Sequence, residues 1–525
     1  MQITPNRRIA RAAGAVMAAF VLSNLAGLAR QILVAGRFGT LPELDAFNAA
    51  NRVSETLFTL IAGGALGSAF IPTFTGLLTQ GKRRRAWQLA SAVANWLLVL
   101  LGLISLAAFF LAPQIVRYLL ASGFAKNPAQ EALTIHLLRL MLPSAVLFSL
   151  SGLVMGILNS YQVFFIPALT PAMYQFGLIF GVLVLAPQMG IQGLAWGVVI
   201  GAALHLLLQI PSLIRLGGNY LPELGIHLPE LREVILLMGP RLLGQAAVQL
   251  NFWVNTNLAS FQPAGSVAGI QFGFALMLMP QAAIAQSIAT AALPTLAAQY
   301  AQGKLEEVRA ALSASLRGVL LLSIPASLGL MLLRTPLVAT LYQRGQFTER
   351  STELVAWALL WYAAGLVGHC LVEVLARAFY ALHDTRTPVA VGVATMSLNV
   401  LLSILLTRVF SQIGWMPHGG LALANSLATA LEAAVLLHLI RRRLNGIEGA
   451  RLAKSSLQAT VAALGMSLGI FAWLRWTSFQ ASWLILAGGI LLGGVSYALG
   501  TWLLGVPEAR RLPLALARRL TRQVR

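Results

Sequence analysis

The stretch RQILVAGRFGTLPELDAFNAANRVSE, residues 30–55, is the most informative part of the chain, because it places charged side chains inside strongly apolar sequence. Its polar residues recur at steps of three and four, so on a helix they share one face. These residues are Asp45, Asn48, Arg52, Glu55 and, just beyond the stretch, Thr59. A charge at the centre of a bilayer costs roughly 2.5–3.5 kcal/mol on insertion scales. The face is therefore predicted to line a wet polar cavity inside a helical membrane protein. The alternative is a structural ion-pair network near one membrane surface, where long side chains reach water.

The composition of the whole chain is that of an integral membrane protein. Of its 525 residues, 58% are hydrophobic and only 10% are charged, whereas soluble domains carry about 25% charged residues. Apolar runs of about 20 residues recur from end to end, and each can cross hydrocarbon roughly 30 Å thick. Strand-like alternation is absent, which predicts an all-α polytopic protein rather than a barrel. About fourteen spans are predicted, near residues 11–36, 45–78, 87–113, 130–158, 164–187, 190–215, 233–262, 267–300, 310–333, 352–382, 387–410, 418–440, 452–475 and 480–505.

The formal net charge of +21 is concentrated in short loops and in the tail. This distribution follows the positive-inside pattern and predicts that both termini are cytoplasmic; it does not indicate a nucleic-acid partner. The first span is interpreted as retained rather than as a removed signal peptide. The lone Cys370 excludes an intramolecular disulfide and a cysteine-built metal site. No metal or other cofactor is predicted.

An internal repeat organises the chain. The strings AFIP (69–72) and QGK (80–82) are echoed by AALP (291–294) and QGK (302–304), an offset of 222 residues from 72 to 294. A second echo relates Leu158-Asn159 and Pro167 to Phe379-Tyr380 and Pro388, at an offset of 221 from 167 to 388. The repeat predicts two parallel six-helix lobes, residues 1–222 and 223–445, followed by a helix pair and basic tail, 446–525. Transporters of this design bind their substrate between the lobes.

The second copy carries polar side chains of its own. Arg241 begins a stripe with steps of four along its span, and Asn255 follows; such groups serve as helix–helix contacts or line a cavity. Farther on, Glu373 and Arg377 are four residues apart on one helix face, which suits a structural ion pair or a proton relay. The sequence contains no HExxH zinc motif, no GxxxxGK[ST] phosphate-binding loop and no nucleophile elbow. No enzyme activity is therefore predicted.

Several irregular strings give the chain a family resemblance. They include GILN (156–159), MGP (238–240), LYQRGQFT (341–348) and AFYALHDTRTP (378–388). With these strings the chain resembles the MurJ/MviN family of lipid II flippases, in the multidrug/oligosaccharidyl-lipid/polysaccharide exporter superfamily, over nearly its whole length.

The resemblance implies fourteen helices, with the terminal pair forming a lipid-facing groove. It also implies alternating access in the bacterial cytoplasmic membrane, carrying lipid II, an undecaprenyl-diphosphate-linked disaccharide-pentapeptide, from the inner to the outer leaflet. A coupling ion or the membrane potential would drive the cycle, and membrane lipids surround it. Arg30 aligns with a cavity arginine of the family and is predicted to contact the diphosphate. The further substrate contacts are predicted at Arg52, Arg241, Asn24, Asn48 and Asn255. Charge partners or gate residues are predicted at Asp45, Glu55, Glu373 and Arg377.

The chain departs from the family pattern at four positions. Asn24 and Phe58 stand where family members carry arginines, Gly63 stands where they carry an acid, and Phe274-Ala275 replaces an Asp-Arg pair. Four hypotheses therefore stay open. The first is a lipid II flippase, and the second is a flippase for another polyprenyl-linked oligosaccharide. The third is a cation-coupled drug exporter, and the fourth is a non-transporting membrane scaffold.

Overall fold

The computed structural model describes residues 5–60, 66–477 and 480–507. Within these ranges every regular element is helical, so the predicted all-α fold is confirmed. Helices are expected here because a backbone in lipid must satisfy its own hydrogen bonds within each segment. By packing, the chain divides into unit 1, Met1–Val267 with Arg344–Phe347, and unit 2, Ala268–Gln343 with Thr348–Arg525. The division at residues 222 and 445, which rests on the sequence repeat, stays a prediction.

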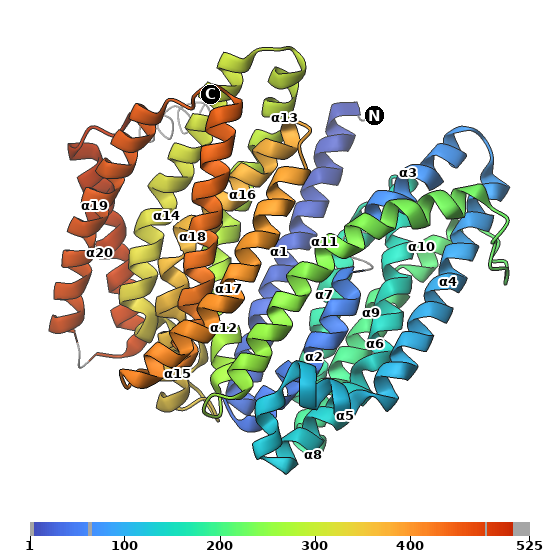
Figure 1. Cartoon of the computed structure of the whole chain (residues 1–525), viewed down its shortest axis with the longest axis horizontal. Helices are drawn as coiled ribbons and strands as arrows, with labels where there is room; N and C mark the ends of the chain where they lie inside the picture. Colours follow the sequence, from blue (N-terminus) through green and yellow to red (C-terminus); the bar gives the residue numbers. More distant parts are fainter. Residues whose placement is uncertain (1–4, 61–65, 478–479, 508–525) are drawn as a thin grey trace. The chain divides into compact units, whose positions relative to one another are not determined.

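The longer helices of unit 1 are drawn from blue to green in Figure 1, where α11 crosses the others obliquely. They are α1 (Pro5–Phe38), α2 (Pro42–Leu60), α3 (Leu66–Thr79), α4 (Arg83–Phe110), α6 (Pro128–Ser160), α7 (Phe165–Phe180), α9 (Ile191–Leu207), α10 (Ile210–Arg215) and α11 (Pro229–Ser260). Short helical turns connect some of them: α5 (Ala112–Gln114), a π-helical turn (Ile115–Leu120), a 3₁₀ turn (Ser122–Lys126), a second π-helical turn (Gly181–Leu185) and α8 (Ala186–Met189).

Unit 2 contains the rest of the helical chain. Its helices are α12 (Ser266–Gln281), α13 (Ser287–Ala301), α14 (Leu305–Tyr342), α15 (Glu349–Ala364), α16 (Leu366–Ala381), α17 (Arg386–Gln412), α18 (His418–Arg443), α19 (Gly449–Trp476) and α20 (Ser482–Leu503). A π-helical turn, Ala282–Gln286, joins α12 to α13 directly after Pro280.

The chain is a multi-pass membrane protein. Among the described residues, eleven helical stretches are long and apolar enough to cross a membrane, and the bent pair α15–α16 would make twelve. The other two predicted spans, 45–78 and 233–262, coincide with α2–α3 and α11. Both stretches carry polar side chains inside their apolar sequence, which lowers their mean hydropathy. The count of fourteen therefore stays a prediction.

Glycines bring α7 and α9 into backbone contact in unit 1. A Cβ atom added at Gly177 would lie 2.2 Å from Cα of Gly201, and one added at Gly181 would lie 2.8 Å from Cα of Gly197. These residues follow the small-xxx-small spacing that lets membrane helices approach closely. The contact fixes the two helices that carry Tyr174 and His205, both of which belong to the site described below.

The segment Arg344–Phe347 packs tightly against the end of α1. The amide of Gln346 donates to the carbonyl of Gly36 at 2.9 Å. Gly345 has φ +57°, and a Cβ there would lie 2.3 Å from the Gly36 oxygen. Only glycine combines this left-handed conformation with such a close approach. Part of the family-like string at residues 341–348 is thereby explained by backbone geometry.

The second family-like string, residues 378–388, ends α16 and starts α17. The Asp384 carboxylate accepts from the Thr387 amide at 3.0 Å and from its hydroxyl at 2.8 Å. Arg443 of α18 adds an ion pair to the same carboxylate. The hydrogen bond from the Thr387 amide is the largest cause that lowers the pKa of Asp384 below its usual value, and Arg443 contributes to the shift. The ionised aspartate thus ties the start of α17 to the end of α18.

Glu448 joins the terminal helix pair to α14 in unit 2. Its carboxylate pairs with Arg317 of α14 at 3.3 Å and with Arg451 of α19 at 3.0 Å. The Tyr497 hydroxyl of α20 donates to the Leu321 carbonyl of α14 at 2.6 Å. The terminal pair is therefore fastened to the bundle by polar contacts in addition to apolar packing.

Candidate functional site

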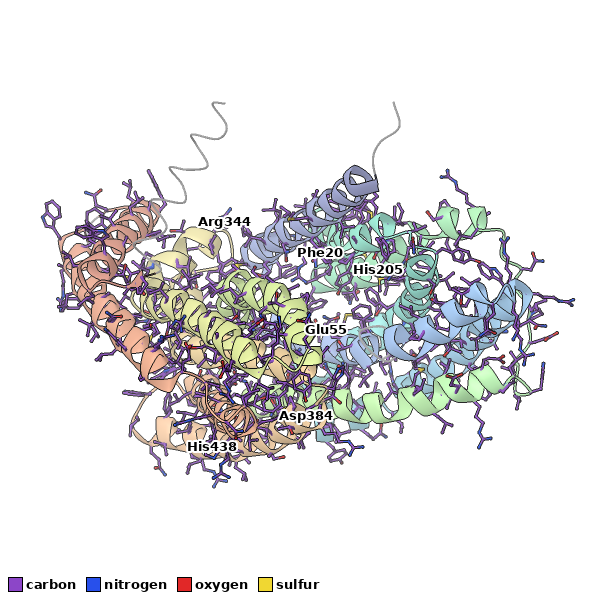
Figure 2. All side chains as sticks on the ribbon, turned by 90° about the horizontal axis from the view of Figure 1, so that it is seen from above. Phe20, Glu55, His205, Arg344, Asp384 and His438 are labelled. Carbon is purple, nitrogen blue, oxygen red and sulfur yellow. The ribbon has the colours of Figure 1, made fainter. Side chains whose placement is uncertain are left out.

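Unit 1 encloses a cavity of about 470 Å³ whose walls come from α2, α6, α7, α9 and α11. Figure 2 labels two of its lining residues, Glu55 of α2 and His205 of α9. The lining joins polar and aromatic side chains: Asn51, Arg52, Ser54, Glu55, Phe58, Thr59, Phe148, Pro171, Tyr174, Gln175, Val198, His205, Gln249 and Phe252. Small-molecule sites typically have volumes of about 300–1,000 Å³.

The polar wall is built on α2. Arg52 and Glu55 form an ion pair at 3.0 Å, and the Asn51 amide donates to the other Glu55 oxygen at 2.8 Å. The Arg52 guanidinium also lies over the Phe252 ring of α11, 5.3 Å from its centroid. The spacing of three and four residues along one helix puts these groups side by side. The cation and the carboxylate among the described residues of this wall are thus already paired.

Thr56 fastens α11 to this wall. The Trp253 indole donates to the Thr56 hydroxyl at 2.8 Å, and that hydroxyl donates to the Arg52 carbonyl at 2.7 Å. Gln249, one turn before Trp253, lies 3.3 Å from the same hydroxyl. Because α11 is held against α2, Gln249 and Phe252 complete the cavity.

The predicted polar face of α2 is divided between two environments. Arg52, Glu55 and Thr59 line the cavity. Asp45 is only 2% exposed and accepts from the Gly265 amide at 2.6 Å, while Asn48 is 8% exposed. Asp45 and Asn48, near the beginning of α2, are therefore buried by packing, whereas Arg52, Glu55 and Thr59 border the open space of the cavity.

Arg30 lies close to the cavity without appearing in its lining. Its helix α1 packs on α7, where a Cβ at Gly27 would lie 3.7 Å from the Gln175 amide carbon. The charges of Arg30 and Glu55 both act on the Tyr174 hydroxyl. Nε of Arg30 is buried and makes no hydrogen bond. The guanidinium is thus positioned beside the site and forms no ion pair with a described residue.

The other predicted substrate contacts have varied surroundings. Asn24 is exposed and donates to the Phe20 carbonyl of its own helix at 3.0 Å. Asn255 donates to Asn251 at 2.9 Å, one turn earlier on α11. The side chain of Arg241 lies outside the described residues. Neither Asn24 nor Asn255 belongs to the described cavity lining, and the role of all three residues as substrate contacts stays a prediction.

The predicted pair Glu373–Arg377 lies in unit 2. Its charged atoms are 2.7 Å apart. Arg377 also donates to the Gln286 carbonyl at 3.2 Å and to the Thr290 hydroxyl at 3.0 Å. A π-helical turn changes the usual pairing of the helix carbonyls. Gln286 is the last residue of the π-helical turn Ala282–Gln286, and Arg377 donates to its carbonyl. This geometry matches the structural interpretation of the pair, and its role in gating stays a prediction.

The departures from the family pattern have different structural consequences. Phe58 lines the cavity, 4.6 Å from the ring of Phe148. In unit 2, Phe274 packs 5.1 Å from Tyr362. Gly63 lies outside the described residues. An aromatic ring therefore occupies the wall position at which the resemblance predicted an arginine in the family pattern.

The sequence analysis did not offer most of the lining residues as site candidates, among them Phe148, Tyr174, Gln175 and His205. These four come from three helices, so no periodicity within one segment brings them together. Gln175 gave one signal, because it is a lone amide within an apolar span. His205 gave a second signal, because an ionisable side chain within an apolar span is rare. Phe148 and Tyr174 gave none, since such residues are ordinary in membrane helices.

Comparison with known proteins assigns the family. The model of the family described as lipid II flippase MurJ matches residues 34–495. The lipid II flippase MurJ of Burkholderia cenocepacia is 30% identical over 88% of this chain and 89% of its own length. The chain belongs to the MurJ family of lipid II flippases. A probable MurJ flippase of Vibrio cholerae is likewise 30% identical, over 96% of this chain and 98% of its own. MurJ proteins are named as flippases, a class of transporter rather than of enzyme.

Solved structures agree with this assignment. A lipid II flippase MurJ in an inward closed conformation matches with a TM-score of 0.78 and 25% identity, over 93% of this chain and 97% of the other. An inward-facing multidrug transporter of the MATE family matches with a TM-score of 0.68 at 16% identity, over 84% of this chain and 99% of the other. The second likeness shows the fold alone, and that fold is the one MurJ shares with the wider superfamily.

Proposed function

We propose that this chain moves lipid II from the inner to the outer leaflet of the bacterial cytoplasmic membrane by alternating access, with both termini in the cytoplasm. Membership of the MurJ family supports the substrate. The many apolar helices support the location, and the clustering of basic residues in alternate loops supports the orientation. A coupling ion or the membrane potential as energy source, and a binding site between the two predicted lobes, belong to the same proposal.

The observation that carries the proposal is the polar cavity within unit 1. Amides, an ion pair and hydroxyls border a space of about 470 Å³ inside a bundle of apolar helices. Charges within a bilayer are costly, and they almost always face a bundle interior or a water-filled cavity. A path for a hydrophilic headgroup supplies the reason to keep such a cavity.

In this proposal Arg30 contacts the diphosphate. Its guanidinium has a buried nitrogen without a partner, and arginine matches phosphate oxygens with two parallel donors. Glu55 holds Arg52 through the observed ion pair. Further contacts from Arg241, Asn24, Asn48 and Asn255, and a gating role for Asp45, complete the assignment.

The test replaces the flippase of a depleted bacterium with this gene and scores growth. Wild type is expected to restore growth, and Arg30→Ala is expected to abolish rescue at unchanged protein level, because the diphosphate loses its cation. Arg408→Ala removes an equal charge from an exposed position on α17 and should rescue like wild type. Normal rescue by Arg30→Ala would remove this residue from the mechanism.

A second candidate is a flippase for another polyprenyl-linked oligosaccharide. The aromatic residue Phe58 favours it, because this residue borders the cavity at a position where the resemblance predicted an arginine in the family pattern. Purified protein in liposomes would distinguish the two: lipid II or the other lipid would become accessible in the opposite leaflet. Movement of neither lipid by a folded protein would support the scaffold hypothesis instead.

A further inference from the structure

The cavity of unit 1 also has an aromatic wall, to which α2 contributes as it does to the polar one. Phe148 of α6 is at its centre, with ring centroids 4.6 Å from Phe58, 5.0 Å from Tyr174 and 5.5 Å from His205. These four rings come from four different helices, α2, α6, α7 and α9. Aromatic rings offer broad, rigid faces that pack against the apolar faces of a ligand.

His205 is fixed within this wall by hydrogen bonds behind it. Its Nδ1 lies 2.6 Å from the Ser151 hydroxyl, and the Gln209 amide donates to that hydroxyl at 2.5 Å and to the His205 carbonyl at 3.0 Å. Ser151 and Gln209 are fully buried. The imidazole is therefore part of a preformed surface, which reduces the ordering cost of binding.

Among the lining residues that the structure describes, the charges of the polar wall cancel. The cation, Arg52, and the carboxylate, Glu55, are paired with each other. The remaining polar groups on this wall are the amides of Asn51, Gln175 and Gln249 and the hydroxyls of Ser54 and Thr59. Two buried atoms on this wall, Nε of Arg52 and Oε1 of Gln175, have no hydrogen-bond partner. Nε of Arg52 is a donor and the Gln175 oxygen is an acceptor, so the wall offers a ligand both kinds of group.

We propose that this cavity binds the uncharged, hydroxyl- and acetamido-bearing sugar of the lipid-linked cargo, and that the diphosphate lies outside it, toward Arg30. This assignment rests on the proposed function and specifies which part of the substrate the cavity takes. A diphosphate offers acceptors and negative charge only. In this cavity the negative charge of Glu55 offsets the attraction of Arg52 for a diphosphate. The amides could then use only their N–H groups, because a diphosphate has no donors to offer their oxygens. Sugar hydroxyls and acetamido groups both donate and accept, and the ring faces can pack on the aromatic wall.

The volume of the cavity is sufficient for only part of the lipid II headgroup. A cavity of about 470 Å³ belongs with sites for drug-sized ligands, and a disaccharide carrying a pentapeptide is larger than such a ligand. The sugar thus enters, while the peptide and diphosphate extend beyond the enclosed space.

The test measures dissociation constants of the full-length protein for two probes, lipid II and undecaprenyl diphosphate, by native mass spectrometry. Gln175→Met keeps the side-chain volume and removes the amide, so lipid II should bind about tenfold more weakly while undecaprenyl diphosphate binds unchanged. Phe58→Leu, at a partly exposed position, should show the same selectivity through the lost ring face. Arg30→Ala should weaken both probes, because both contain the diphosphate.

Gln130→Met is the matched control. This glutamine also belongs to unit 1, where its amide donates to the Pro42 carbonyl at 3.1 Å away from the cavity, and both affinities should stay at the wild-type value. Equal loss of both probes in Gln175→Met and Phe58→Leu, or no loss of either, would overturn the sugar assignment while leaving lipid II transport intact. Failure of wild type to bind or move lipid II would instead overturn the proposed function and the sugar assignment together.

Discussion

Replacing Gly177 by alanine tests whether the contact of α7 with α9 builds the cavity. The new Cβ would lie 2.2 Å from Cα of Gly201, whereas carbon atoms in contact prefer about 3.5–4.0 Å. The two backbones must therefore separate by about 1.3 Å or more. Since both sides are backbone, no side-chain rotation can relieve the clash.

The expected cost follows from two opposing terms. Overpacking costs about 1–3 kcal/mol, and the upper end applies because backbone meets backbone. Alanine returns up to about 1 kcal/mol through its better helix propensity. The net loss of about 2 kcal/mol should lower the melting temperature by roughly 2–4 °C, because the unfolding entropy of a chain this long is large. Gln175 and Tyr174 lie on the displaced helix, so lipid II affinity should fall as well.

Gly102→Ala provides the control for the same chemical change. Gly102 lies within α4, and a Cβ there would meet nothing within 4 Å, so melting temperature and affinity should equal or slightly exceed those of wild type. The assay is thermal unfolding of purified protein followed by tryptophan fluorescence, with lipid II binding measured on the same samples. If Gly177→Ala and Gly102→Ala behaved alike in both measurements, the backbone contact would not be what shapes the site.

Three further predictions concern elements outside the cavity. Asp384→Asn should lower thermal stability at pH 7, and wild type should lose the corresponding stability below about pH 4. The hydrogen bond from the Thr387 amide lowers the pKa of the Asp384 carboxyl in the folded state. Asp384 therefore stabilises the fold above its unfolded-state pKa, and this stabilisation is lost as the pH falls through its folded-state pKa. A melting-temperature series across that range checks the sign, and identical slopes for both proteins would contradict it. Gly345→Ala should release its segment from the Gly36 carbonyl, 2.3 Å from the added Cβ, and so speed local amide hydrogen exchange at residue 346; unchanged exchange would disprove this contact. Glu448→Ala should destabilise unit 2 by about 1 kcal/mol, since two arginines lose their partner, and denaturant unfolding that matches wild type would show that the ion pairs contribute nothing.

Sequence patterns predicted best what depends on neighbours along one helix. The helical class followed from apolar run lengths, and the Arg52–Glu55 and Glu373–Arg377 pairs followed from spacings of three and four residues. The face from Asp45 to Thr59 was predicted as one polar surface. Its division between a packed end and a cavity wall depends on which neighbouring helices α2 meets, and periodicity carries no information about that.

The residue pattern is enough to predict a bundle of membrane helices, one of which carries charges that need a polar environment, because both properties follow from the cost of exposing polar groups to lipid. What surrounds those charges depends on how the helices pack. Phe148, Tyr174, Gln175 and His205 reach the cavity from α6, α7 and α9. They converge because glycines let α7 and α9 touch and because Trp253 anchors α11 to Thr56, and such long-range packing leaves no repeating pattern in the chain.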